Sequence, residues 1–292
     1  MPDPYSKKTL AIRTLKHLVF RLHSSVDELQ KVAAEAEVSY SFWQKKKKNG
    51  KLRQISAPNP RLKRIQVSIH NLLKEIELPS CVHCGVKGRS NLTNAKMHAG
   101  HEWVLSLDFK EFFPSISHHL VYHTFRHELD CSPPVASILT RLSTLLAQVP
   151  QGGPMSTDIA NLVCRRLDRR LLGLADRYGL KYTRYCDDLC FSGYCVPDSF
   201  KGTLKEIVGQ CSFSLNPDKE SLCGKHQPQI VTGLTVNHKR LCVPRKTRRA
   251  WRKDRHLFFK YEAEQLPEKI RSKQEQRHEG RHAYLVYVNQ VH

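Results

Sequence analysis

RYCDDLCFSG, residues 184–193, places two adjacent carboxylates inside an otherwise apolar run. Asp187 and Asp188 stand between KYTRYC and LCFSGY, two β-rich runs of the kind that pair as a hairpin. Carboxylates are rarely buried unless a partner compensates their charge, and that partner could be a Lys, an Arg or a metal ion. Taken alone, Asp-Asp is also consistent with a simple turn, because Asp is a common turn former.

A third carboxylate follows a second predicted strand. The segment HEWVLSLD, residues 101–108, has the pattern of a strand that ends at Asp108. If this strand and the 184–193 hairpin pair in one sheet, Asp108, Asp187 and Asp188 converge. Two divalent ions about 3.5–4 Å apart need bridging acidic ligands of this kind. Mg²⁺ prefers carboxylates together with substrate phosphates, so the pattern predicts phosphoryl transfer by positioning and electrostatics.

The charge of the chain points to a polyanionic partner. The 292 residues carry a formal net charge of +21 and 40% hydrophobic residues, which suffices for a folded core. Such an excess of positive charge favours nucleic acid as the partner. No apolar run is long enough to span a membrane, so a membrane partner is not expected. The N-terminus lacks the pattern of a signal peptide, and ten cysteines without one indicate reduced thiols and a cytoplasmic protein.

The order of predicted elements indicates an α+β fold. Helical periodicity covers residues 9–38, a basic hairpin follows at 43–57 with its turn at Asn49-Gly50, and a helix resumes at 62–76. From residue 101 to 237 the order is strand, helix, helix, strand hairpin, helix, strand. This order predicts helices packed on an antiparallel sheet rather than a doubly wound fold. From residue 238 onward the chain is strongly basic and carries helical runs.

Two other groups of potential metal ligands stay open at this point. Cys81 and Cys84 form a single C-x-x-C without a second pair at zinc-ribbon spacing. His119, His123 and His127 share one face of a predicted helix, where a solvated surface explains them as well as a metal does.

Five segments in order resemble the motifs of reverse transcriptases. Tyr185-Cys-Asp-Asp188 resembles their Y-x-D-D signature, LSLDFKEFFPSI their first catalytic segment, and PQGGPMSTDIANLVC their Pro-Gln-Gly segment. KKKKNGKLRQISAPNPRLKRIQ resembles the fingers pattern, and FSLNPDKESL the segment after the catalytic hairpin. The resemblance implies a right-hand polymerase: N-terminal helices and fingers at 1–100, a palm at 101–237 with some fingers elements interleaved, and a basic helical thumb at 238–292.

Two shorter motifs resemble the bacterial retron type of this family. Asn94-Ala-Lys-Met-His98 matches N-A-x-x-H, and Val231-Thr232-Gly233 matches V-T-G. The retron resemblance implies a bacterial enzyme that primes DNA synthesis from a 2′-hydroxyl of its own structured non-coding RNA, which gives a branched RNA–DNA product (msDNA). It also implies a role in defence against phage, with a possible effector protein as a further partner.

The resemblance also implies roles for individual residues. Asp108, Asp187 and Asp188 would hold two Mg²⁺ ions, for which Mn²⁺ could substitute, and Lys219 would protonate the departing pyrophosphate. The deoxynucleoside triphosphate would be contacted by Arg53, Lys63, the main chain at Glu111 and Phe112, Phe113 under the sugar, Gln151 and Gly152. The RNA would be contacted by Asn94, His98, Val231, Thr232, Gly233, Arg245, Lys246, Arg248, Arg249 and Arg252.

Two alternatives stay open on the sequence. The first is another bacterial reverse transcriptase, of the intron or abortive-infection type. The second is a non-catalytic RNA-binding protein that retains a polymerase fold, although the intact set of three aspartates argues against it. The cognate RNA, the branching nucleotide, the effector and the oligomeric state do not follow from the sequence.

Overall fold

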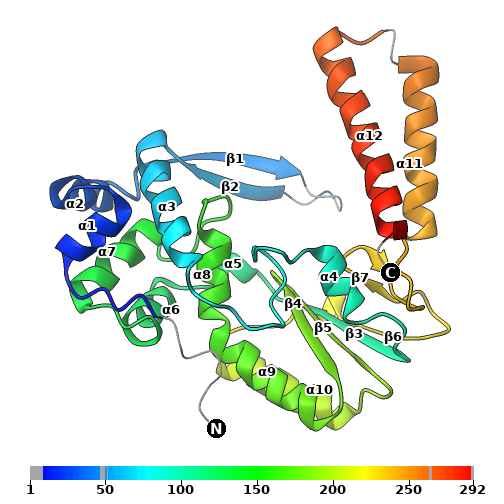
Figure 1. Ribbon diagram of the computed structural model, residues 1–292, viewed down its shortest axis with the longest axis horizontal. Helices are drawn as coiled ribbons and strands as arrows, with labels where there is room; N and C mark the ends of the chain where they lie inside the picture. Colours follow the sequence, from blue (N-terminus) through cyan, green and yellow to red (C-terminus); the bar gives the residue numbers. More distant parts are fainter. Residues whose placement is uncertain (1–8, 47–49, 51, 263–264, 291–292) are drawn as a thin grey trace.

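The computed structural model describes residues 9–46, 50, 52–262 and 265–290, and its elements have the α+β arrangement that the sequence predicts (Figure 1). A small helical region with a projecting hairpin lies beside a sheet with its own helices, and a pair of long helices stands off the far side. In the described part of the chain, no helix combines the length and the apolar character needed to cross a membrane.

The N-terminal region consists of three helices and a two-stranded ribbon. The elements are α1 (Leu15–Leu22), α2 (Val26–Ala34), β1 (Tyr40–Lys46), β2 (Leu52–Pro58) and α3 (Pro60–Leu73). The Ser25 hydroxyl caps α2 by accepting a hydrogen bond from the backbone N–H of Glu28. Strands β1 and β2 pair antiparallel from Tyr40↔Pro58 to Lys46↔Leu52. Asn49 of the expected turn lies outside the described residues.

The central sheet has four antiparallel strands in the order β4-β5-β3-β6. Its strands are β3 (Trp103–Asp108), β4 (Lys181–Tyr185), β5 (Asp188–Gly193) and β6 (Ser221–Gly224). One side carries α9 (Arg165–Arg177) and α10 (Asp198–Gln210). The helix α4 (Asn91–Lys96) contacts β4 and also the short ribbon of β7 (Ile230–Val231) and β8 (Leu234–Thr235).

Side chains of the sheet alternate between two hydrophobic clusters. Leu105 and Phe191 belong to the large core that continues into the N-terminal helices. Val104 and Cys190 belong to a smaller cluster with α4, β7 and β8. Because side chains along a strand point to opposite faces with a period of two, Asp108 on β3 and the first residue of β5 share the face of the smaller cluster.

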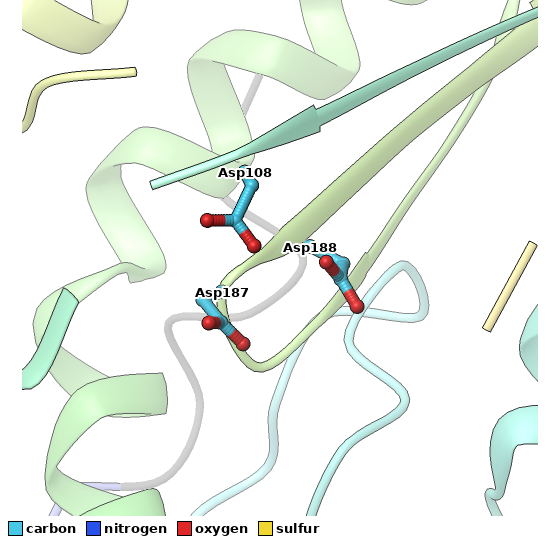
Figure 2. A group of neighbouring side chains, drawn as sticks. All are labelled: Asp108, Asp187 and Asp188. Carbon is cyan, nitrogen blue, oxygen red and sulfur yellow. The ribbon is translucent and has the colours of Figure 1, made fainter. Parts of the chain in front are cut away.

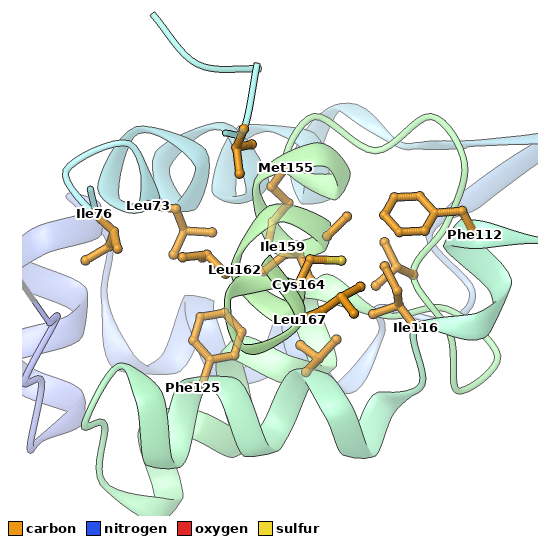
Figure 3. Packing of buried hydrophobic residues seen from close by; sticks show 14 of the residues in the cluster. Leu73, Ile76, Phe112, Ile116, Phe125, Met155, Ile159, Leu162, Cys164 and Leu167 are labelled. Atoms are coloured by element: carbon orange, nitrogen blue, oxygen red, sulfur yellow. The ribbon is translucent and has the colours of Figure 1, made fainter. Parts of the chain in front are cut away.

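The large core is centred on α8 (Ser156–Val163), as Figure 3 shows. Around it lie α3, α5 (Phe112–Ser115), α6 (His118–His123) with the π-helical turn Thr124–Glu128, and α7 (Pro133–Ser143). The helical segment after Pro154 is divided at Cys164 into α8 and α9. The split fits their surroundings, because α8 is largely buried whereas α9 has one exposed side.

The basic C-terminal region forms a helical pair. It comprises α11 (Arg245–Leu257), a π-helical turn at Phe258–Glu262 and α12 (Glu268–Gln290). No residue of α11 is buried, whereas Phe258 is buried against His278. Figure 1 shows this pair standing off the sheet, on the same side as the projecting β1–β2 hairpin. The division into N-terminal helices and fingers (1–100), palm (101–237) and thumb (238–292) stays a prediction.

His98 links α4 to the sheet. Its side chain is fully buried, and its two ring nitrogens make 2.7 Å hydrogen bonds with the hydroxyls of Ser192 and Thr183. A neutral imidazole donates with one nitrogen and accepts with the other, so both bonds suit the uncharged ring. Burial lowers the pKa of His98 to about 3, with a further contribution from His101.

This burial predicts a pH-dependent stability. The unfolded chain takes up a proton at His98 near pH 6.5, the folded chain only near pH 3, so stability falls as the pH is lowered below 6.5. Each such histidine contributes up to about 1.4 kcal/mol per pH unit in that window. Urea unfolding of wild type and His98→Gln between pH 4.5 and 8 measures the free energy of unfolding of each protein. Plotted against pH, the two free energies should converge as the pH is lowered. Parallel plots would contradict the attribution of this pH dependence to His98.

Candidate active site

The structure brings Asp108, Asp187 and Asp188 together at one edge of the sheet. Asp108 ends β3 and lies directly opposite Asp188, the first residue of β5. Asp187 precedes it in the tight turn from β4 (Figure 2). One carboxylate oxygen from each residue lies within 4.8 Å of the other two. The convergence predicted from the two strands is therefore present.

Backbone hydrogen bonds hold these three segments in place. The Asp187 carbonyl accepts from Phe109 N–H at 3.1 Å, and the Asp108 carbonyl accepts from Asn216 N–H at 2.8 Å. The turn itself has only two residues, and its first, Cys186, has φ +59°. A left-handed backbone is unfavourable for a residue with a Cβ, so the surroundings must stabilise this turn.

The carboxylates repel one another. Burial, together with the neighbouring carboxylates of Asp187 and Asp108, raises the pKa of Asp188 to about 7, although the residue as a whole keeps contact with solvent. Like charges directly opposite each other in a sheet destabilise it unless something compensates them. An all-oxygen set of converging carboxylates fits a hard divalent cation, which would supply that compensation.

Lys219 lies in the same site. It ends the 3₁₀ turn Pro217–Lys219, and its Nζ is 2.7 Å from Asp108 Oδ2. A lysine therefore pairs with Asp108, whereas the expectation of metal ions as partners concerned Asp187 and Asp188 and stays a prediction. The place of Lys219 beside the carboxylates is compatible with the predicted proton donation to pyrophosphate.

The V-T-G segment lines a pocket of about 230 Å³ together with Asp108 and Asp188. Thr232 (φ +44°) and Gly233 (φ +83°) form the two-residue turn between β7 and β8. Such a turn, with positive φ at both positions, explains the glycine. The Thr232 hydroxyl donates to the Asn91 carbonyl at 2.9 Å, and the Asn94 amide donates to that hydroxyl at 3.5 Å. The two short motifs thus contact each other.

Burial corrects part of the predicted RNA contact. Asn94, His98 and Val231 are buried, so their side chains support α4 and the ribbon rather than reach RNA. Within these two motifs, the residues accessible for direct contact are Gly233, which is exposed, and Thr232, which is half-buried. The pattern of polar residues in a short motif could not distinguish the buried positions from the exposed ones.

The predicted nucleotide contacts occupy several elements. Arg53 pairs with Lys45 through the backbone of the ribbon, and its side chain lies outside the described part of the structure. Lys63 is exposed in the first turn of α3. Glu111 is exposed with φ +49° before α5, and Phe113 is half-buried. Phe112 is buried, 5.2 Å between ring centroids from Phe109.

Gly152 permits a close approach between the fingers ribbon and the Pro-Gln-Gly loop. The Gln151 carbonyl accepts from the backbone N–H of Ser56 at 2.9 Å. Gly152 has φ +120°, and a Cβ there would lie 2.9 Å from the Ser56 carbonyl oxygen and 3.1 Å from Ile55 Cγ2. The backbone at Gly152 therefore lies close to the backbone of β2, and a side chain at this position would clash with it.

The basic residues of the thumb form an exposed surface on α11. All of the predicted contacts there are exposed: Arg245, Lys246, Arg248, Arg249 and Arg252. Phe259 is half-exposed with the Arg255 guanidinium 5.8 Å from its ring centroid.

Among the described residues, the aspartates are the one group of three or more His, Cys, Asp or Glu ligands close enough to share an ion. The pair Cys81/Cys84 and the helix-face histidines 119, 123 and 127 do not join such a group in that part of the chain. Sequence reasoning missed the buried Arg184, which lies on β4 beside the turn that carries Asp187. Its place just before the two adjacent aspartates was a signal that could have drawn attention to it.

Comparison with known proteins settles the family. A model of the family "Reverse transcriptase (RNA-dependent DNA polymerase)" matches residues 44–236, more than half of the chain. The chain belongs to this family. Among its relatives is the retron Ec86 reverse transcriptase of Escherichia coli, 30% identical over 240 residues that cover 80% of this chain and 75% of the relative.

Other relatives place this reverse transcriptase in the retron type. The retron Mx162 and Mx65 reverse transcriptases of Myxococcus xanthus are 31% and 38% identical over 79% and 65% of this chain. The chain spans about half of their lengths, 52% and 49%. The chain is therefore an RNA-directed DNA polymerase of a family that implies dependence on a divalent metal, and it contains a group of three aspartates that could hold such an ion.

A solved structure supports the fold. The telomerase from Candida albicans, in complex with a TWJ fragment of telomeric RNA, aligns with a TM-score of 0.51 at 10% identity. The alignment covers 70% of this chain and 46% of the telomerase. With the antiparallel sheet and its helices, this likeness shows the right-hand polymerase fold that the sequence predicts.

The contact at Gly152 predicts that Gly152→Ala separates the fingers ribbon from the Pro-Gln-Gly loop. An alanine combines the forbidden φ with the clash against Ser56, which should cost about 1–3 kcal/mol of unfolding free energy. Denaturant unfolding and limited proteolysis within β1–β2 measure the two effects.

The matched control is Gly173→Ala in α9, where no atom lies within 4 Å of the added Cβ. Alanine there should stabilise the helix by up to about 1 kcal/mol. Equal changes in unfolding free energy and in proteolysis for the two substitutions would contradict the conclusion that the close approach to β2 requires glycine at position 152.

Proposed function

We propose that this reverse transcriptase serves a retron and copies its cognate RNA into DNA with two Mg²⁺ ions. The observation that carries the proposal is the convergence of Asp108, Asp187 and Asp188 beside a pocket lined by the V-T-G turn. The RNA would be both template and primer, and a 2′-hydroxyl of that RNA would receive the first deoxynucleotide. The product would be a branched RNA–DNA molecule.

The three aspartates would hold the ions through their converging oxygens. When bound, such ions lower the pKa of an attacking hydroxyl and neutralise charge on the leaving pyrophosphate. In each addition a bond forms between the hydroxyl oxygen and the α-phosphorus, and the bond to pyrophosphate breaks. Lys219, whose Nζ lies 2.7 Å from Asp108 Oδ2, would give a proton to the departing pyrophosphate. Mn²⁺ would substitute for Mg²⁺ on the same oxygens.

The remaining parts would bind the substrates. The half-buried ring of Phe113 would pack under the deoxyribose, with Gln151 and the main chain at 111–112 around the nucleotide. Thr232, Gly233 and the basic face of α11 would contact the structured RNA, where phosphate and 2′-hydroxyl contacts dominate recognition. A role in anti-phage defence in the bacterial cytoplasm, with an effector protein, completes the proposal.

Neutralising either turn carboxylate should abolish DNA synthesis and leave RNA binding intact. Asp187→Asn and Asp188→Asn each remove a charge from the set that holds the ions, while the basic surfaces are unchanged. We expect primer extension on an RNA template to fall at least about a hundredfold.

Asp176→Asn, an exposed change on α9, is the control and should extend like wild type. Filter binding to the same RNA should not distinguish the four proteins. Residual extension near the wild-type rate in either turn variant would refute the proposed role.

The α11 surface should set the salt dependence of RNA binding. Arg248→Gln with Arg252→Gln removes two exposed charges, and each lost phosphate contact reduces the slope of log K against log salt by about 0.7–0.9. Titrations between 50 and 300 mM salt measure this slope. Arg177→Gln, an exposed arginine at the end of α9, should leave it unchanged. An unaltered slope in the α11 variant would exclude this face from the RNA contact.

A further inference from the structure

The side chain of Arg184 is the largest that is fully buried among the described residues. It lies on β4, two residues before the turn that carries Asp187. Its Nε and Nη2 donate to the two carboxylate oxygens of Asp168 on α9, at 2.9 and 2.7 Å. Both side chains have no exposed surface. The Tyr182 hydroxyl donates to the same carboxylate at 2.8 Å, which completes a buried polar network.

The remaining guanidinium nitrogen reaches the catalytic turn. Nη1 donates to the Cys186 carbonyl at 3.2 Å and to Asn161 Oδ1 on α8 at 2.9 Å. The Asn161 amide in turn donates to the Cys84 carbonyl at 2.9 Å. A single side chain therefore connects α8, α9 and the turn, and through Asn161 the 81–84 loop.

The backbone of Arg184 reinforces these links. Its N–H donates to the Cys81 carbonyl at 2.8 Å, and its carbonyl accepts from His83 N–H at 2.9 Å. The 81–84 loop thus lies along β4 and limits its movement. Hydrogen bonds from both the backbone and the side chain of Arg184 therefore hold the end of β4 in place.

We infer that Arg184, oriented by Asp168, is a positioning residue that sets the conformation of the turn and hence the place of Asp187 and Asp188. The turn needs such support, because Cys186 has φ +59° without being glycine. The Arg184 donor binds the carbonyl of that same strained residue. The planar fork of an arginine can pair with Asp168 and reach Cys186 at once, whereas a lysine has one nitrogen for both tasks.

Stability alone gives a weak reason for this network. Two fully buried charges lose their hydration, and apolar replacement of such pairs is often neutral or stabilising. What the apolar replacement would not supply is a donor aimed at the Cys186 carbonyl. The inference rests on the proposed metal-holding role of the aspartates, since it concerns how accurately their oxygens are placed.

The test is direct binding of Mn²⁺, measured by the electron paramagnetic resonance signal of the free ion. Arg184→Lys keeps the charge beside Asp168 and removes the fork. We expect the full-length variant to bind Mn²⁺ about tenfold more weakly, the scale of effect known for groups that orient metal ligands. Primer extension should need a correspondingly higher Mg²⁺ concentration for half-maximal rate, with RNA affinity unchanged.

Arg61→Lys is the matched control. Arg61 also makes a two-pronged pair, with Glu28 at 2.9 and 2.6 Å, but in the N-terminal helices. This variant should bind Mn²⁺ as wild type does. Circular dichroism at the binding temperature establishes that each protein is folded.

A second variant covers the case in which Arg184→Lys does not fold. Arg184→Met with Asp168→Leu and Tyr182→Phe replaces the network by apolar groups, and it should fold yet bind Mn²⁺ weakly. Wild-type Mn²⁺ affinity in either folded variant would overturn the inference. Failure of both to fold would overturn it as well, because the network would then support the domain and not the turn specifically.

The proposed metal site has its own test in the same assay. Asp188→Asn should weaken Mn²⁺ binding whether or not Arg184 matters. If wild type and Asp188→Asn bind Mn²⁺ equally, the metal-holding role fails, and the inference that Arg184 positions metal ligands fails with it.

Discussion

The site depends on keeping three carboxylates close together although they repel one another. The pairing of β3 with β5 places Asp108 opposite Asp188, and the two-residue turn adds Asp187. The raised pKa of Asp188 reflects burial and this repulsion. Backbone hydrogen bonds to Asp187 and Asp108 oppose the repulsion, and Lys219 compensates part of the charge. The rest of the palm can be understood as the support for this arrangement.

Much of the site could be predicted because its signals are local. A strand that ends in Asp108 and a hairpin with Asp187 and Asp188 at its tip are patterns within a few residues. The period of two indicates which residues of each strand share a face with its aspartate, whereas the pairing of β3 with β5, which brings Asp108 opposite Asp188, is a tertiary contact. The same reasoning predicted the α+β class and the basic helical pair. These elements agree with the structure because local preference and the global fold coincide there.

The interior polar residues could not be predicted in the same way. N-A-x-x-H has the composition of a surface motif, yet Asn94 and His98 are buried. Their burial depends on α4 packing against Thr183, Ser192 and Thr232, residues that are distant in sequence. The long-range pairing of Arg184 with Asp168 likewise leaves no periodic signal. Hydrogen-bonded networks of this kind are set by tertiary packing, which periodicity does not report.

The two short motifs also explain how the thumb is attached. The backbone carbonyl of Asn91 accepts a hydrogen bond from the Thr232 hydroxyl. The side-chain amide of Asn91 donates a hydrogen bond to the Tyr284 hydroxyl of α12 at 2.7 Å. Val288 of α12 is buried in the same cluster as Leu92 and Val231. The base of the thumb, the V-T-G turn and the face of the sheet that carries Asp108 and Asp188 therefore share one small core. That core also carries the turn that lines the pocket, so a continuous set of packed side chains connects α12 with the pocket beside the aspartates.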